Sequence, residues 1–101
     1  MSYLMVLRIP VDPDEFVRAA GENQELLNGI SGRAKERGAI HHAFYRGSEG
    51  IVAVDEWDSP ESFQGFWDAE GENIGQLMAA ASAGEPAPPM FHEKISLGDE
   101  F

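Results

Sequence analysis

Residues 51–67, which read IVAVDEWDSPESFQGFW, decide the fold of this chain. The first seven are rich in β-branched residues and end in a tryptophan, which predicts a strand over residues 51–57. Ser59 and Pro60 then form a typical helix start, because serine caps a first turn and proline suits the first helical position. A strand that leads at once into a capped helix is therefore expected here.

Working outward from this stretch, the same two kinds of pattern recur along the chain. A tight turn is expected at residues 47–50 (GSEG), where it joins two strands into a hairpin. The expected strands span residues 3–9, 40–46, 51–57 and 90–95, and the expected helices span residues 13–37 and 60–78. This order predicts one α+β domain over residues 1–101, a ferredoxin-like βαββαβ fold with a four-stranded antiparallel sheet and two helices on one face.

The two expected helices share an internal similarity. Residues 16–27 (FVRAAGENQELL) and 66–77 (FWDAEGENIGQL) agree at six of twelve positions with a constant offset of fifty. Resemblance between amphipathic helices explains this agreement, and so does duplication of a βαβ half. The sequence leaves both explanations open, and both predict that each helix breaks at Gly-Glu-Asn. Asp12, Pro13 and Glu15 also predict a capping box at the first helix.

Composition excludes several classes of function. The 101 residues include 18 Asp plus Glu against 7 Lys plus Arg, a formal net charge of −11, which repels nucleic acid and anionic membrane surfaces. The absence of cysteine excludes disulfides, thiolate metal sites and a cysteine nucleophile. The start of the chain has no leader pattern and no run long enough to cross a bilayer, so a cytoplasmic location is expected.

The strands are apolar on both sides, which predicts association. In residues 3–9, Leu4 and Val6 point to one face of the sheet, while Met5, Leu7 and Ile9 point to the other. Two helices can cover only one face of a four-stranded sheet. Leaving the other face in water is costly, at about 1.5–3 kcal/mol for each apolar side chain. A second copy packed sheet against sheet is the simplest cover, so a homodimer is expected.

The residues Val54-Asp-Glu-Trp57 followed by Ser59-Pro-Glu-Ser-Phe63 resemble the dimeric α/β-barrel superfamily, and within it the antibiotic biosynthesis monooxygenase type. The resemblance implies a homodimer with a cavity between sheet and helices in each subunit. Members include cofactor-independent oxygenases of aromatic polyketides, haem-degrading enzymes and isomerases. Trp57 matches the tryptophan of the oxygenase pattern, but residues 3–9 lack its asparagine. The helical histidine of the haem-degrading branch is also absent, and Trp67 stands near its place.

Candidate catalytic residues are His42 and Arg8. His41 and His42 are neighbours on a strand and must point to opposite faces, so they cannot easily share a metal, and no metal site is expected. A single histidine in a cavity can accept a proton, which makes His42 the candidate base and Arg8 the candidate anion stabiliser. A hydrogen-bonded or interface histidine, and an arginine solvated at a strand end, are the structural alternatives.

Candidate ligand-binding residues are mostly aromatic. Trp57 and Trp67 are expected to line an apolar pocket, with Tyr45 and Phe63 beside them and Glu56, or else Asp55, as a polar anchor. The alternative is that the aromatic residues only form the core.

These residues together predict a homodimer that binds a small apolar or aromatic molecule in a sheet–helix cavity, as a cofactor-independent monooxygenase. No glycine pattern for nucleotides is present, and no cofactor is expected. The alternatives are a non-enzymatic ligand-binding or interaction module, which a cavity below about 300 Å³ would favour, and a haem-binding protein.

Overall fold

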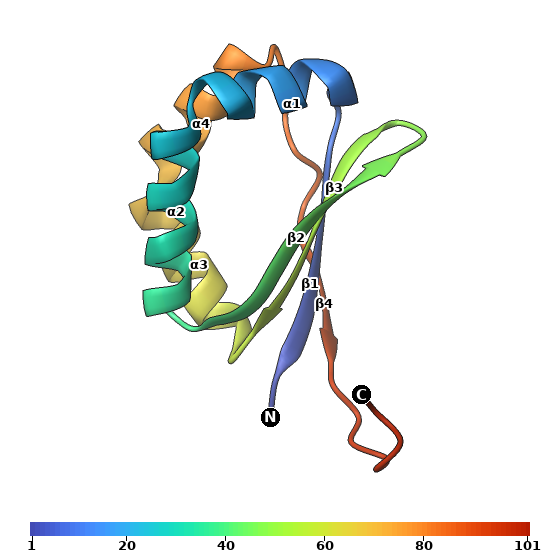
Figure 1. The fold of residues 1–101 in the computed structure, drawn as a ribbon. Helices are drawn as coiled ribbons and strands as arrows, with labels where there is room; N and C mark the ends of the chain where they lie inside the picture. The colour runs from blue at the N-terminus through green and yellow to red at the C-terminus, as the bar shows by residue number, and fades with distance from the viewer.

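A computed structural model describes residues 1–101 and contains the four expected strands, with each expected helix divided in two (Figure 1). The elements are β1 (Tyr3–Ile9), α1 (Pro13–Glu22), α2 (Gln24–Glu36), β2 (Ala39–Gly47), β3 (Gly50–Trp57), α3 (Pro60–Ala69), α4 (Gly71–Ala80) and β4 (Met90–Glu93). The strands pair antiparallel in the order β2-β3-β1-β4, which confirms the predicted ferredoxin-like topology. No helix combines the length and apolarity needed to cross a membrane.

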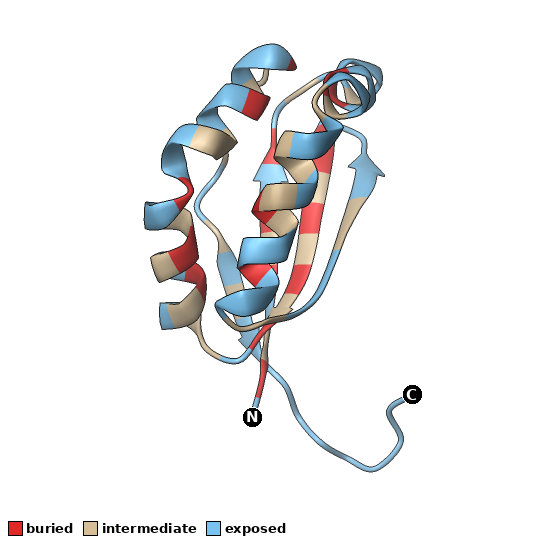
Figure 2. Cartoon of the chain, turned by 60° about the vertical axis from the view of Figure 1, so that its left-hand side comes forward, coloured by how far each residue is buried: buried red, intermediate tan, exposed pale blue.

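All four helices lie against one face of the sheet, and the other face is bare (Figure 1). We call these the helix-covered face and the open face. Alternation along the strands assigns each residue to one of them. The open face carries the even-numbered residues of β1 and β4, those of β3 from Val52 to Glu56, and the odd-numbered residues of β2 from His41 to Gly47, which are exposed or half-buried. The bulge in β2 turns Ala39 to the helix-covered face instead. The buried core lies between the helix-covered face and the helices (Figure 2).

The predicted helix starts are confirmed, with one difference in detail. The Asp12 side chain accepts a hydrogen bond from the backbone N–H of Asp14 at 2.9 Å, and proline follows the cap. Ser59 accepts from the backbone N–H of Ser62 at 3.1 Å, again before a proline. Each bond satisfies a backbone N–H that has no partner inside its helix.

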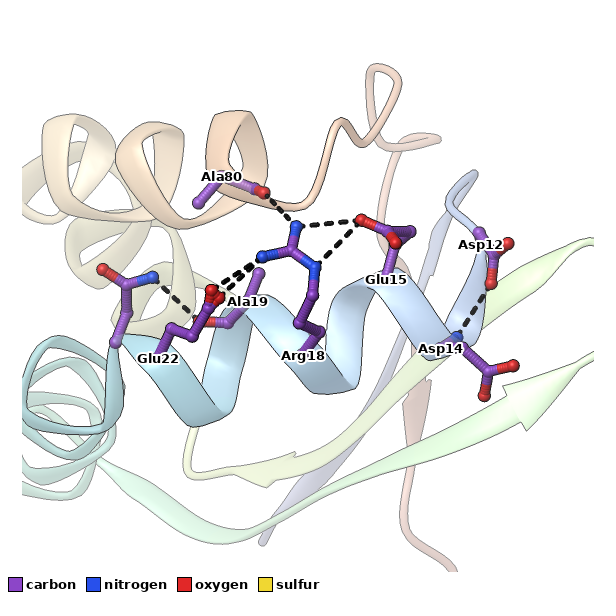
Figure 3. Close-up of polar contacts among 8 residues, drawn as sticks. Asp12, Asp14, Glu15, Arg18, Ala19, Glu22 and Ala80 are labelled. Carbon is purple, nitrogen blue, oxygen red and sulfur yellow. Dashed lines mark hydrogen bonds and ion pairs between the residues drawn. The ribbon is translucent and has the colours of Figure 1, made fainter.

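The capping box predicted with Glu15 is not formed, because Arg18 holds the Glu15 carboxylate (Figure 3). Arg18 also pairs with Glu22 at 2.7 Å, one turn further along α1. Its third contact is a 3.1 Å hydrogen bond to the backbone carbonyl of Ala80 at the end of α4. A guanidinium can bind all three partners because it has five N–H donors. The hydrogen bond to Ala80 joins α1 to α4.

The helix breaks fall at different places in the two halves. In the first half the break is at Asn23, the last residue of Gly-Glu-Asn, as expected. In the second half it is at Glu70, one residue before Gly71, so the predicted common break is wrong there. Glu70 turns inward, where the Arg33 guanidinium binds its carboxylate at 2.8 Å. The break is therefore set by an ion pair and not by the glycine.

The hairpin between β2 and β3 has a loop of two residues, Ser48 and Glu49, and Gly47 pairs with Gly50. Gly50 has φ +146°, and a Cβ there would lie 2.2 Å from the carbonyl oxygen of Ile9. Only glycine tolerates both conditions. The loop fixes which residues of the two strands face each other, from the turn as far as His41 and Glu56, before a bulge near the far end.

The connector, residues 84–89, runs along the edge of β1. The backbone N–H of Gly84 donates to the carbonyl of Pro10 at 2.8 Å, and that of Ala87 donates to the carbonyl of Arg8 at 2.9 Å. The three prolines of this segment donate no hydrogen bond, which suits an edge position. The connector thus forms a wall beside α3 and α4.

Candidate functional site

A cavity of about 70 Å³ lies between the helix-covered face and helices α2, α3 and α4. Fourteen of the seventeen residues that line it are hydrophobic, and the others are Ser31, His42 and Asp55. Asp55 is buried, so little solvent screens its carboxylate, whereas the His42 side chain is 34% exposed. The chemistry of the cavity therefore rests on the histidine and the aspartate.

His42 and Asp55 face each other across the β2–β3 hairpin. His42 Nδ1 lies 2.5 Å from Asp55 Oδ1, and Asp55 is only 6% exposed. The second carboxylate oxygen accepts a hydrogen bond of 3.1 Å from the indole N–H of Trp57. Asp55 is thus held on both sides, by the histidine and by a fully buried tryptophan.

This arrangement directs the other ring nitrogen of His42. A carboxylate accepts hydrogen bonds, so the neutral histidine carries its proton on Nδ1 and leaves a lone pair on Nε2. His42 Nε2 makes no hydrogen bond within the chain, and the ring packs edge-on against Phe44 at 4.7 Å between centroids. A histidine oriented by a buried carboxylate is well placed to accept a proton from a molecule in the cavity.

Trp57, expected to line the pocket, lies beneath it instead. The side chain is 0% exposed and packs against Phe63 and Phe66, at 5.6 and 5.4 Å between ring centroids. The cavity wall includes Phe63 and Phe66 but not Trp57. Trp57 therefore acts on the cavity through Asp55, which it orients.

Trp67 and Phe63 do line the cavity, as expected for ligand-binding residues. Their rings are stacked at 5.8 Å with an interplanar angle of 29°. Phe63 is buried, whereas Trp67 is half-buried and its indole nitrogen makes no hydrogen bond within the chain. The two tryptophans of this chain thus have different surroundings.

Three predicted site residues lie on the open face, away from His42. Arg8 contacts Met90, with Nη1 3.9 Å from the sulfur, and Tyr45 is 57% exposed. Glu56 accepts a hydrogen bond from the Ser2 hydroxyl and pairs with Lys94 at 3.7 Å. The sheet separates these side chains from the cavity, so one chain does not bring Arg8, Tyr45 or Glu56 together with His42.

The histidines are also separated. His41 lies on the open face of β2 and His92 on the open face of β4, the two strands at opposite edges of the sheet. This is the placement that the ferredoxin-like topology predicts. The structure contains no group of three His, Asp or Glu side chains that could hold a metal ion.

The helix layer is fastened next to the cavity by the Arg33–Glu70 ion pair. Glu70 is 5% exposed, and the Arg33 guanidinium that donates to it holds the pKa of its carboxyl below the ordinary value. Asn73 adds a hydrogen bond of 3.4 Å to the same carboxylate oxygen. The pair joins α2 to the junction of α3 and α4, two sides of the cavity.

Sequence reasoning considered Asp55 only as an alternative to Glu56, although the signal for it was present. With a two-residue loop and Gly47 opposite Gly50, counting back along both strands places His42 opposite Asp55. The tight turn was recognised, so the cross-strand pair could have been predicted from the same residues.

No family model and no curated protein matches this chain. Among solved structures, a dimeric ferredoxin-like protein from an uncultured marine organism is 18% identical, with a TM-score of 0.65, over 93% of this chain and 91% of that one. The protein has a ferredoxin-like fold. This conclusion agrees with its strand order and with the antibiotic biosynthesis monooxygenase-like proteins that it also resembles.

Two further ferredoxin-like neighbours are named as oxygenases. A monooxygenase of Streptomyces coelicolor, in complex with nanaomycin D, is 18% identical with a TM-score of 0.62, over 93% of this chain and 88% of that one. SnoaB, a cofactor-independent oxygenase of Streptomyces nogalater, is 15% identical with a TM-score of 0.61, over 98% of both chains. At such identities the likeness shows the fold alone.

Proposed function

We propose that this protein is a cytoplasmic homodimer that binds a flat aromatic molecule on the cavity side of its sheet. His42 removes a proton from that molecule, which then reacts with O₂ without a cofactor. The observation that carries the proposal is the His42–Asp55 pair, with Nδ1 and Oδ1 2.5 Å apart, in a cavity whose remaining walls are apolar except for Ser31.

The reaction needs only a base from the protein. His42 Nε2 takes a proton from an activated CH₂ group of the substrate, and the resulting carbanion gives its electrons to O₂ and forms a C–O bond. His42 returns the proton to the terminal oxygen to form a hydroperoxide. Loss of water then leaves a ketone, so that R₂CH₂ + O₂ becomes R₂C=O + H₂O. The apolar walls favour the delocalised, weakly hydrated anion of an aromatic substrate over a small charged one.

The structural neighbours support the choice of reaction. One is a monooxygenase bound to nanaomycin D and another is a cofactor-independent oxygenase, and each aligns with more than nine-tenths of this chain. Fold alone does not imply function, so the proposal rests on the dyad and takes the reaction class from these neighbours.

The open face supports the homodimer. Leu4, Tyr45 and Met90 on this face are 41%, 57% and 51% exposed, around half-buried valines of the central strands. An apolar face of this kind is typical of a surface that a partner covers. A neighbour of the same fold is a dimeric ferredoxin-like protein.

Charge on the open face also permits two copies to approach. The chain has a net charge of −11, yet on this side of the sheet Arg8 and Lys94 balance the acidic Glu56 and Glu93. The excess acidic residues therefore lie elsewhere, and two open faces can meet without bringing like charges together.

Oxygen consumption with 1,8-dihydroxyanthrone, whose ring CH₂ is acidic, tests the proposed reaction. His42→Gln should lower the rate by about 10²–10⁴-fold, the usual contribution of a general base. His41→Gln is the matched control, since His41 is the neighbouring histidine on the open face, and its rate should stay near wild type. Equal rates for the two variants would reject His42 as the base.

A non-enzymatic binding module is the second candidate, and the cavity volume favours it. The cavity of about 70 Å³ is far below the roughly 300 Å³ of ordinary small-molecule sites. In that case the wild-type protein would bind the anthrone, or bind nothing, and oxygen consumption would equal that of buffer alone.

A further inference from the structure

Trp67 lies where three hollows of the molecule meet. It lines the 70 Å³ cavity, a hollow of about 320 Å³ between α3 and the connector, and a hollow of about 370 Å³ between α4 and the connector. No other side chain lines all three. The two outer hollows, which share Glu85 and Pro86 as walls, are called here the outer groove. Trp67 thus borders the interior cavity and both outer hollows. Leu7 and Phe63 also border the cavity and the hollow at α3, and Ile74 and Met78 border the cavity and the hollow at α4.

Trp67 is held in this position by weak contacts. Its indole stacks on Phe63 and makes no hydrogen bond within the chain. Trp57, by contrast, is fully buried and donates a hydrogen bond to Asp55. An aromatic stack contributes only about 0.5–1.5 kcal/mol beyond burial, so movement of Trp67 mainly loses its partial burial against the core, which is less than the full burial and hydrogen bond that hold Trp57.

The outer groove has room to receive the indole. Gly71 and Gly75 line it, and a Cβ placed on either would meet no atom within 4 Å. Larger side chains at these two positions would fill space that the glycines leave open.

The proposed function needs more space than the cavity offers. A cavity of about 70 Å³ cannot hold a polycyclic molecule, whereas each outer hollow exceeds the roughly 300 Å³ typical of small-molecule sites. We propose that Trp67 is a gate that swings over Gly71 and Gly75, and that the opened cavity and outer groove form one elongated site. This inference rests on the proposed function in one respect, namely that the inner end of the ligand reaches His42.

The outer groove also limits the chemistry of the ligand. Glu85 is the single charged side chain among its walls, which are otherwise apolar, apart from Gln64 and backbone. A carboxylate in such a wall favours a hydroxyl donor and disfavours a carboxylate or phosphate. The outer end of the ligand is therefore uncharged and carries hydroxyl groups.

Fluorine NMR of protein labelled with 5-fluorotryptophan tests the gate directly, because the chain has only two tryptophans. Trp67→Phe assigns the two resonances. In the wild type, the Trp67 resonance should broaden by exchange and shift on addition of 1,8-dihydroxyanthrone, while the Trp57 resonance should change little.

Gly75→Leu, which fills the space over α4, should sharpen the Trp67 resonance and weaken anthrone binding by about tenfold, since fewer molecules reach the open state. Gly32→Leu is the matched control, because Gly32 is another mid-helix glycine with open space around its Cβ, far from the outer groove. It should leave both the resonance and the affinity as in the wild type.

Two results would overturn the gate. The first is a Trp67 resonance that does not change on addition of anthrone or in Gly75→Leu. The second is an equal affinity for anthrone in Gly75→Leu and Gly32→Leu. These outcomes are independent of the base. Loss of the proposed function would appear as equal oxygen consumption for His42→Gln and His41→Gln, with the behaviour of Trp67 unaffected.

Discussion

The two faces of the sheet have similar apolar side chains but different surroundings. In β1, Met5 is 1% exposed on the helix-covered face, and its neighbour Leu4 is 41% exposed on the open face. In β3, Asp55 is buried beneath the helices and contacts His42 and Trp57, while Glu56 is half-buried and pairs with Ser2 and Lys94. Adjacent residues of the same type thus lie in a buried setting on one face and in a more exposed setting on the other.

The comparison teaches that burial, and not composition, separates the surroundings of the two carboxylates. A carboxylate surrounded by apolar groups orients a histidine strongly, because water does not compete for it. Glu56, on the open face, is half-buried and its ion-pair partner Lys94 is exposed, so solvent weakens that pair. The following changes test this difference between the faces, beginning with the largest expected effect.

Trp57→Ala should lower the free energy of unfolding by about 3–5 kcal/mol, because it leaves a cavity among packed aromatic rings and removes a hydrogen bond from Asp55. Tyr45→Ala, on the open face, should cost much less at protein concentrations where the chain is monomeric. Urea denaturation measures both. Similar losses for the two variants would show that the faces do not differ in this way.

Val54→Asp should dissociate the proposed homodimer, because two-fold symmetry would bring two new carboxylates near each other at the centre of the open face. Like charges across an interface cost several kcal/mol, so the dimer dissociation constant should rise by roughly 100-fold or more. Sedimentation measures this, and circular dichroism checks that the chain stays folded. Val17→Asp, at an exposed position of α1, is the control and should leave the association unchanged.

Trp57→Phe separates the hydrogen bond of Trp57 from its packing. Phenylalanine fills most of the space but leaves Asp55 with His42 as its remaining partner, which should cost about 1–3 kcal/mol of stability. Trp67→Phe removes an indole N–H that has no partner within the chain and should cost far less. Thermal denaturation of the two variants under the same conditions makes the comparison, and a larger loss for Trp67→Phe would contradict it.

Much of the fold could be predicted from local patterns. Ser59 and Pro60 mark a helix start whatever lies around them, and the alternation in β1 predicted two apolar faces. The break at Glu70 could not be predicted, because it depends on Arg33, thirty-seven residues away in the chain. Interactions between distant residues leave no periodic signal in a single sequence.

The candidate site was predicted only in part, for a related reason. Both faces of β1 and β3 are apolar, so alternation grouped residues correctly but could not tell which group the helices cover. Arg8 and His42 were therefore assigned to one site, and the structure places them on opposite faces. The hairpin register was the missing step, since it pairs His42 with Asp55 whichever face is covered.

The smallest expected effect concerns Glu70, whose carboxyl has its pKa lowered mainly by the hydrogen bond from Arg33. The folded chain therefore binds this proton less readily than the unfolded chain. The stability that the ion pair adds is fully present above the ordinary carboxyl pKa of 4.5 and is lost as the pH falls through the lower value of the folded chain. Between about pH 6 and about pH 3, Glu70→Gln should lose less of its stability than the wild type.

Glu72→Gln provides the control, because Glu72 is an exposed carboxylate only two residues further along, in the first turn of α4. Its urea midpoint should fall with pH in parallel with that of the wild type.

The Arg33–Glu70 pair joins two sides of the cavity, so the same acid titration should also loosen the helices over the helix-covered face while leaving the strand pairing intact. Hydrogen exchange at low pH would then increase in α2 and α4 before β1 and β3, and a uniform increase would contradict this role of the ion pair.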